Sequence, residues 1–139
     1  MKRLELDQPD LYAKLVLASP FQQRKAAYTA CKVAVEQNKC NLELVSHSLA
    51  DLSDNGYLTV FVLSKLAESL TYLDDRYFDL SEDPDLKETA LVTFRQARLV
   101  SALWFAGNGS LQADEAIYEA LSSAKDKSSL VLSVLLYLG

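Results

Sequence analysis

The sequence predicts an all-α fold, and three observations support this prediction. Half of the 139 residues are hydrophobic, which is enough to bury a core in a chain of this length. Four glycines and three prolines leave few points at which a helix must end. Apolar residues recur at helical spacing along most of the chain. We therefore expect one domain, folded as a bundle of about six to seven helices.

The first two predicted helices meet at Ser19-Pro20. A short helix within residues 11–18 ends there, because proline disfavours the helical conformation at the residue before it. Ser19 then caps a second helix, which begins at Pro20 and runs to about residue 37. The apolar face of this second helix is predicted to hold Phe21, Tyr28, Cys31 and Val35.

Two more helices are expected before residue 74. Asn41 can cap the first of them, and its narrow apolar stripe ends at Asp54-Asn55-Gly56. The next helix spans about residues 57–73 and has the most regular apolar pattern in the chain. Its inward face is predicted to hold Leu58, Phe61, Val62, Leu66, Leu70 and Leu73.

The helical pattern is lost between Asp74 and Asp85, where acidic residues crowd together with Tyr77 and Phe78. A segment without a regular apolar period is typical of a loop. We therefore expect the one long connection of the fold at about residues 74–83.

Three helices are predicted after this connection. A helix capped by Asp83 runs to about residue 106, where Gly107 would supply a left-handed C-cap. Ser110 starts the next helix, and a serine near residue 128 caps a last, apolar helix at the end of the chain.

The order of these elements is similar in the two halves of the chain. Ser19-Pro20 and Asp83-Pro84 each begin a long helix, and each long helix is followed by a shorter one and then by an apolar one. This similarity predicts two three-helix units, at about residues 10–73 and 83–139. The two units would stack, because neither buries its apolar face well alone.

The charge balance limits the classes of partner. Nineteen acidic residues against fourteen lysines and arginines give a net charge of −5. Such a chain repels polyanions, so we expect no direct binding to nucleic acid, whereas a basic protein would be attracted.

The pattern at the start of the sequence and the longest apolar stretch bear on localisation. No basic stretch followed by an apolar run is present at the start, which indicates a cytoplasmic protein. The longest apolar stretch, residues 130–138, is about half of the roughly 20 residues that a membrane span needs. We expect it to form a buried C-terminal helix and expect no membrane association.

Few residues suggest catalysis or metal binding. His47 is the only histidine, and Asp51, four residues later, could orient its ring as in a general base. No third catalytic partner is evident, and an exposed helical histidine beside an aspartate explains the same pair. Cys31 and Cys40 lack the close spacing of metal ligands. We therefore expect a protein that is not an enzyme and binds no metal or cofactor, with His47 and Asp51 as the remaining candidates for catalysis.

The acidic segment with its aromatic residues is the predicted binding surface. Aromatic rings supply the contact area that dominates binding energy, and carboxylates steer a basic partner. A solvated linker whose rings pack against the bundle is the alternative. The residues predicted to contact a partner are Asp74, Asp75, Tyr77, Phe78, Asp79, Glu82 and Asp83.

The segment Arg24-Lys25-Ala26-Ala27-Tyr28-Thr29-Ala30-Cys31 packs small residues around one aromatic ring. This segment, in a small, acidic, all-helical chain without a catalytic constellation, resembles the bacterial immunity proteins of contact-dependent inhibition and related polymorphic toxin systems. The resemblance implies a monomeric inhibitor that occludes the active site of a toxin domain with a basic surface. It implies no particular site residues.

A second hypothesis stays open, namely a helical scaffold or regulatory subunit that associates with itself. In that case the apolar C-terminal helix, or another exposed helix face, would form the interface between copies.

Overall fold

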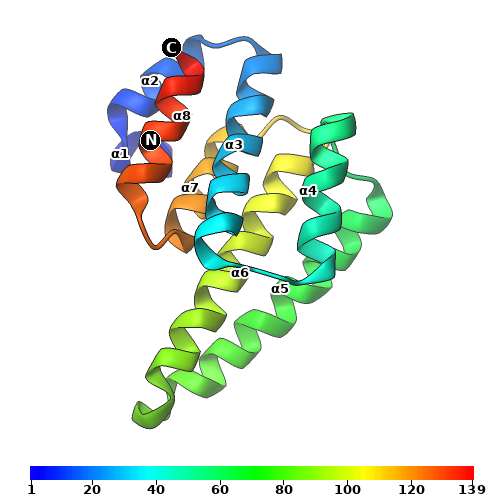
Figure 1. Ribbon diagram of the computed structural model, residues 1–139, viewed down its shortest axis with the longest axis vertical. Coiled ribbons are helices and arrows are strands. Elements are labelled where there is room, and N and C mark those ends of the chain that lie inside the picture. The colour runs from blue at the N-terminus through cyan, green and yellow to red at the C-terminus, as the bar shows by residue number, and fades with distance from the viewer.

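The computed structural model describes residues 1–139 and contains helices and turns but no β-strand (Figure 1). The α-helices are α1 (Arg3–Asp7), α2 (Pro9–Leu17), α3 (Pro20–Asn38), α4 (Glu43–Asn55), α5 (Val60–Ser81), α6 (Lys87–Gly107), α7 (Ala113–Ser123) and α8 (Lys127–Leu138), and a short 3-10 helix, η1 (Pro84–Leu86), precedes α6. The prediction of an all-α bundle is confirmed. The sequence analysis did not predict α1, which is only five residues long.

The predicted boundary between the first two helices at Ser19-Pro20 is confirmed, and it separates α2 from α3. The amide of Gln22 donates to the Ser19 hydroxyl at 3.2 Å, and the Gln22 side chain accepts from the Ser19 amide at 3.1 Å. This reciprocal capping box, with Pro20 at the first helical position, satisfies amides that a helix start leaves unpaired. Gly56 ends α4 with φ +82°, a left-handed conformation that glycine adopts without strain.

Four predicted caps differ from the structure. The N-cap of α4 is Leu42, so Asn41 does not cap this helix. α7 begins at Ala113 rather than next to Ser110, and Asp126 caps α8 by accepting a hydrogen bond from the Ser129 amide at 3.0 Å. Gly107 is not a left-handed cap, because it belongs to α6 and has no positive φ. It is buried where the amide of Leu58 donates to its carbonyl at 3.1 Å, so glycine is needed there for close approach.

All the long helices share one core. α6 contributes ten buried residues and packs against α3, α4, α5 and α7. α3 offers a face of alanines and one cysteine, which lets α6, α7 and α8 approach its backbone closely. The two halves of the sequence therefore bury their apolar faces against each other and form one body.

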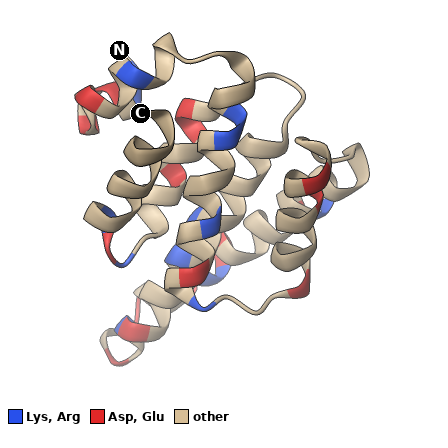
Figure 2. Ribbon diagram, turned by 45° about the horizontal axis from the view of Figure 1, so that its top comes forward, with Lys and Arg blue, Asp and Glu red and all other residues tan.

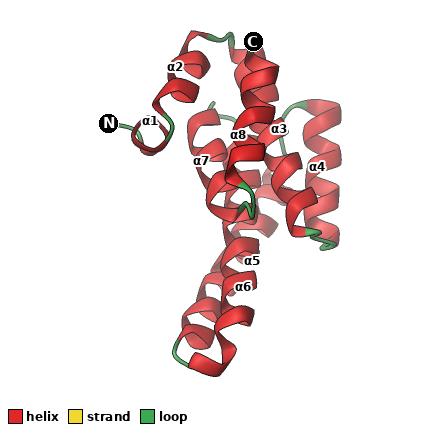
Figure 3. Ribbon diagram, turned by 60° about the vertical axis from the view of Figure 1, so that its left-hand side comes forward, coloured by secondary structure: helices red, strands yellow, loops and turns green.

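The prediction of a long loop at residues 74–83 is wrong, because α5 continues as a helix to Ser81. The end of α5 and the start of α6 form an antiparallel hairpin that projects from the body (Figures 1 and 3). We call residues 72–94 the arm. Tyr77 packs against Phe94 with ring centroids 5.4 Å apart, and Leu73 is buried at the base of the arm. Within the arm, α5 contacts α6 only along the narrow strip that holds Leu73 and Tyr77. The arm therefore lacks the broad apolar face that identifies a helix of the core.

The opposite end of the molecule holds α1, α2 and α8, which lie together near both ends of the chain (Figure 1). Lys14 joins α2 to the last residue by donating to the backbone oxygen of Gly139 at 3.1 Å. None of the helices combines the length and the apolar character needed to span a lipid bilayer.

Candidate partner-binding surface

The arm carries the net charge of the whole chain. It holds seven acidic residues against Arg76 and Lys87, which is a net charge of −5. The rest of the chain holds twelve acidic and twelve basic residues and is therefore neutral overall. Figure 2 shows charged positions clustered at the tip of the arm, at the lower left of the view. The field of the protein is thus most negative at its most protruding part.

Two of the seven predicted contact residues face inward. The carboxylate of Asp74 accepts a hydrogen bond from Arg98 Nη2 of α6 at 3.0 Å. Tyr77 is half-buried between Phe94 of α6 and Phe78. Asp74 and Tyr77 therefore hold the two helices of the arm together.

The other five predicted residues are exposed. Asp75 and Asp79 are four residues apart, as are Phe78 and Glu82, which places these four residues on one face at the end of α5. Asp83 is also exposed, but its side chain caps η1 by accepting from the Asp85 amide at 2.9 Å. The structure thus brings together four of the seven predicted residues as one open surface.

Tyr72 belongs to the same surface, although it was not among the predicted contact residues. Its ring is 63% exposed and lies one turn before Asp75 and Arg76, while Phe78 is 65% exposed. The helical continuation of α5 aligns these two rings with the carboxylates. The position of Tyr72 could be found only once this helix was known.

The outer carboxylates have no partner within the fold. No lysine, arginine or histidine nitrogen lies within 4.0 Å of Asp75, Asp79 or Glu82. Like charges three or four residues apart on a helix destabilise it by roughly 0.2–0.5 kcal/mol per pair. Acidic residues at a helix C-terminus also oppose the helix dipole. Folding therefore does not explain why these side chains are acidic.

A groove lies on the same arm, beside η1 and the start of α6. Its volume is about 710 Å³, and Tyr77, Leu91 and Phe94 form its apolar part. Asp83 and Glu88 add carboxylates to its lining, and Lys87 adds one cation. Leu91 and Phe94 were missed as site residues because they lie on a different helix from the acidic segment. The groove therefore places an apolar surface next to the negative one.

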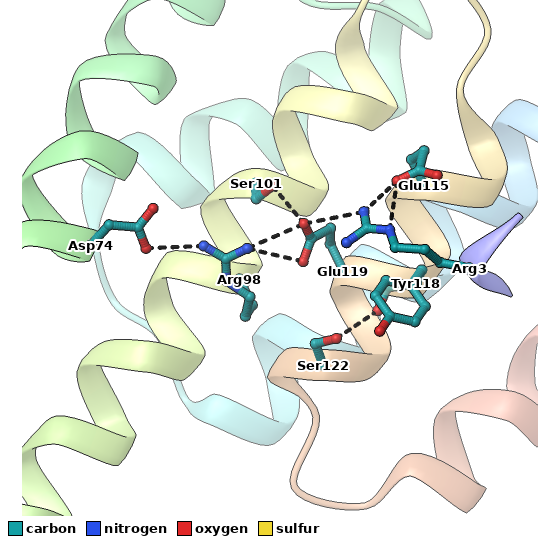
Figure 4. Close-up of polar contacts among 8 residues, drawn as sticks. All are labelled: Arg3, Asp74, Arg98, Ser101, Glu115, Tyr118, Glu119 and Ser122. Carbon is teal, nitrogen blue, oxygen red and sulfur yellow. Dashed lines mark hydrogen bonds and ion pairs between the residues drawn. The ribbon is translucent and has the colours of Figure 1, made fainter. Parts of the chain in front are cut away.

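A network of ion pairs fixes the base of the arm to the body (Figure 4). Arg98 bridges Asp74 of α5 and the buried carboxylate of Glu119 in α7, at 3.0 and 3.2 Å. Glu119 also accepts from Ser101 at 3.2 Å and pairs with Arg3 of α1 at 3.5 Å. Four helices therefore meet at Glu119 or its partners, which gives the arm a rigid attachment.

The residues considered for chemistry do not assemble into a larger site. The Nε2 of His47 lies 3.4 Å from Asp51, and the imidazole is 64% exposed, with no third catalytic group in contact. Cys31 is fully buried in α3, and burial raises the pKa of its thiol to about 12. No group of three or more His, Cys, Asp or Glu residues lies close enough together to hold a metal ion.

Neither models of known protein families, nor curated protein sequences, nor solved structures gave a match to this chain.

Proposed function

We propose that this chain is a protein-binding inhibitor of the immunity type, which recognises a basic protein partner through its arm. The observation that carries the proposal is the location of the full net charge of −5 on the exposed arm, while the rest of the chain is neutral. We further propose that it acts in the cytoplasm on a toxin domain whose active or binding surface is basic.

The arm has the physical properties that such an inhibitor needs. Its unpaired carboxylates attract a basic surface at long range and raise the association rate, and salt weakens this attraction. Phe78 and Tyr72 supply exposed rings of the kind that dominate binding energy once buried. The ion pairs of Arg98 hold the arm in place before binding, so less conformational entropy is lost in the complex.

Occlusion follows from the shape of the arm. A two-helix hairpin that projects from the body (Figure 3) can enter a cleft or cover its mouth, while the body blocks further access. Catalysis by the inhibitor is not required in this mechanism, which needs only contact area and opposite charge.

Affinity purification from cells of the source organism tests the proposal. The arm variant combines Asp75→Asn, Asp79→Asn and Glu82→Gln, and the control variant combines Asp7→Asn, Asp10→Asn and Glu36→Gln, which removes the same charge from exposed positions elsewhere. We expect the wild-type chain and the control to retain a basic protein that the arm variant loses. Equal retention by all three chains would contradict the assignment of the surface.

Self-association is a second candidate function, and the end of the molecule opposite the arm favours it. α8 has no charged residue after Lys127 and is drawn tan in Figure 2. Leu17 of α2 is 87% exposed, and Leu132 and Leu136 of α8 are also exposed. Leu132 and Leu136 lie one turn apart on α8, and neighbouring exposed leucines of this kind are typical of an interface.

Light scattering of the purified chain separates the two functions. A stable dimer that Leu136→Asp converts to a monomer would support self-association. A monomer at concentrations around 100 μM would contradict it, because interfaces of standard size bind far more tightly than this.

A further inference from the structure

A second groove lies at the end of the molecule opposite the arm, where the start of α3, the end of α4 and the α6–α7 connection meet (Figure 1). Its volume is about 510 Å³, which is within the range of small-molecule sites. The rings of Phe21, Tyr28 and Tyr57 line it, together with the cationic side chains of Arg24 and Lys25. The groove on the arm has one cation, Lys87, and two carboxylates, whereas this groove has two cations and one carboxylate, and it is independent of the proposed function.

The two cations of the groove have no anionic partner in the protein. No carboxylate oxygen lies within 4.0 Å of Arg24 or Lys25. Arg24 Nη2 makes one long contact, 3.5 Å, with the backbone oxygen of Gly109, and Lys25 Nζ lies 5.8 Å from the centre of the Phe21 ring. Both cations therefore keep hydrogen-bond donors available for an anion.

Two of the three rings of the groove are not explained by the core, whereas Tyr28 packs against it. Phe21 was predicted to lie on the inward face of its helix, but the structure shows it 68% exposed, and Tyr57 is 58% exposed. Tyr28 is half-buried and lies further in. Exposed rings beside a concave site offer flat surfaces on which another ring can stack.

Asp54, the single carboxylate in the lining, further limits which ligands the groove can bind. It lies in the last turn of α4 and has no cation within 4.0 Å. A carboxylate accepts hydrogen bonds from N–H groups but repels an anion. The groove therefore suits a ligand whose anionic group and N–H donors lie apart, rather than a simple anion.

We propose that this groove binds a small ligand that joins an anionic group to a flat aromatic ring with N–H donors, as an adenine nucleotide does. The anionic group contacts Arg24 and Lys25, the ring stacks on Tyr57 or Phe21, and Asp54 accepts from the ring.

Isothermal titration of the full chain with adenosine monophosphate, adenosine and inorganic phosphate tests this proposal. We expect adenosine monophosphate to bind at least about tenfold more tightly than either of its parts, because each part uses only half of the site. Weaker binding at higher salt is also expected, since the contacts with Arg24 and Lys25 are between charges.

Variants identify the site. We expect Arg24→Gln and Lys25→Gln each to weaken binding by about five- to tenfold, because each removes a charge-assisted hydrogen bond. Lys32→Gln is the matched control, since Lys32 is exposed on the same helix but outside the groove, and it should leave binding unchanged. Circular dichroism of each variant checks that α3 is intact.

Two results would overturn the proposal. The first is no binding of adenosine monophosphate at millimolar concentration to the folded wild-type chain. The second is equal binding by the wild-type chain and the Arg24→Gln/Lys25→Gln double variant. Either result is independent of partner binding by the arm, which lies at the other end of α6.

Discussion

Glu119 is the residue on which the ion pairs of the fold depend most. Glu119 is 4% exposed, and its carboxylate accepts hydrogen bonds from Arg98, Ser101 and Arg3. Removing one partner of a buried pair leaves the other charge unpaired, which costs about 3–5 kcal/mol when both groups are fully buried. The Arg98 side chain is 21% exposed, so part of this cost is relieved by water.

We expect Glu119→Gln to lower the free energy of unfolding by about 2–3 kcal/mol, as measured by urea denaturation. Glu115→Gln is the control, because Glu115 pairs only with the half-exposed Arg3 and should cost under about 1 kcal/mol. Equal effects of the two variants would show that the buried carboxylate has no special part in stability.

The two cysteines are expected to react differently. Cys31 is fully buried with its thiol pKa raised to about 12, whereas Cys40 is only partly buried. At neutral pH a thiol reagent should modify one thiol of the native chain quickly and both after unfolding. The Cys40→Ser variant should lose the fast reaction, and its persistence would contradict the burial of Cys31.

Stability should also depend on alkaline pH through Cys31. Burial raises the pKa of the folded thiol above the ordinary value of 9.0, so the folded chain holds its proton more tightly than the unfolded chain does. This contribution to stability is complete below about pH 9 and is lost as the pH rises toward 12. Denaturation of wild type and Cys31→Ala across this range measures it.

Some residues with local roles were predictable from the sequence, although the caps expected at Asn41, Ser110 and Gly107 were not found. Residues with long-range partners were not predictable. Ser19, Pro20 and Gly56 act through neighbours a few positions away, and their positions in the sequence were sufficient. Glu119 and Arg98 are 21 positions apart on different helices, and their pairing depends on how α6 and α7 pack.

At the scale of helices, the contact between Gly107 and Leu58 fixes α6 against the start of α5. A Cβ atom at Gly107 would overlap the Leu58 side chain, whereas one at Gly109 would meet nothing within 4 Å. Overpacking a core costs about 1–3 kcal/mol, against roughly 0.5–1 kcal/mol that alanine gains over glycine within a helix.

We therefore expect Gly107→Ala to lower the free energy of unfolding by about 1–2 kcal/mol and Gly109→Ala to change it by less than about 0.5 kcal/mol. Thermal denaturation of the two variants provides the measurement. A stabilised Gly107→Ala chain would mean that Leu58 can move aside without cost.

The acidic side chains on the outer face of the arm should destabilise α5. The variant Asp75→Asn/Asp79→Asn/Glu82→Gln removes like-charge pairs at the C-terminal end of α5, so we expect it to be as stable as wild type or more stable by up to about 1 kcal/mol. The difference should shrink at high salt. A loss of stability would show that these carboxylates serve the fold, which would weaken the case that they serve a partner.

The arm is also the element at which the sequence analysis failed. Between residues 60 and 73 one face of α5 meets the core, but Phe61, predicted to be inward, is 69% exposed. Beyond Leu73, the ring of Tyr77 packs against the ring of Phe94 on the neighbouring helix. The acidic residues around Tyr77 concealed the helical period of the sequence. A helix in a two-helix hairpin buries only a narrow row of apolar residues against its one neighbour. A search for the broad apolar face of a core helix therefore misses it.

The whole molecule places different surfaces at its two ends (Figure 1). The arm at one end is acidic and aromatic, and the other end holds the cationic groove and the exposed leucines of α2 and α8. The sequence alone predicted the all-α class and the acidic surface. The separation of charge between arm and body became visible only when the arm was seen to project from a neutral body.

Site-specific photo-cross-linking in cells of the source organism tests the central claim most directly. A photoreactive residue at Phe78 on the arm is compared with one at Leu136 on α8, both exposed positions. The account predicts a covalent adduct with a basic protein from position 78 and none from position 136. Adducts from position 136 alone, or adducts only with a second copy of the chain, would contradict it.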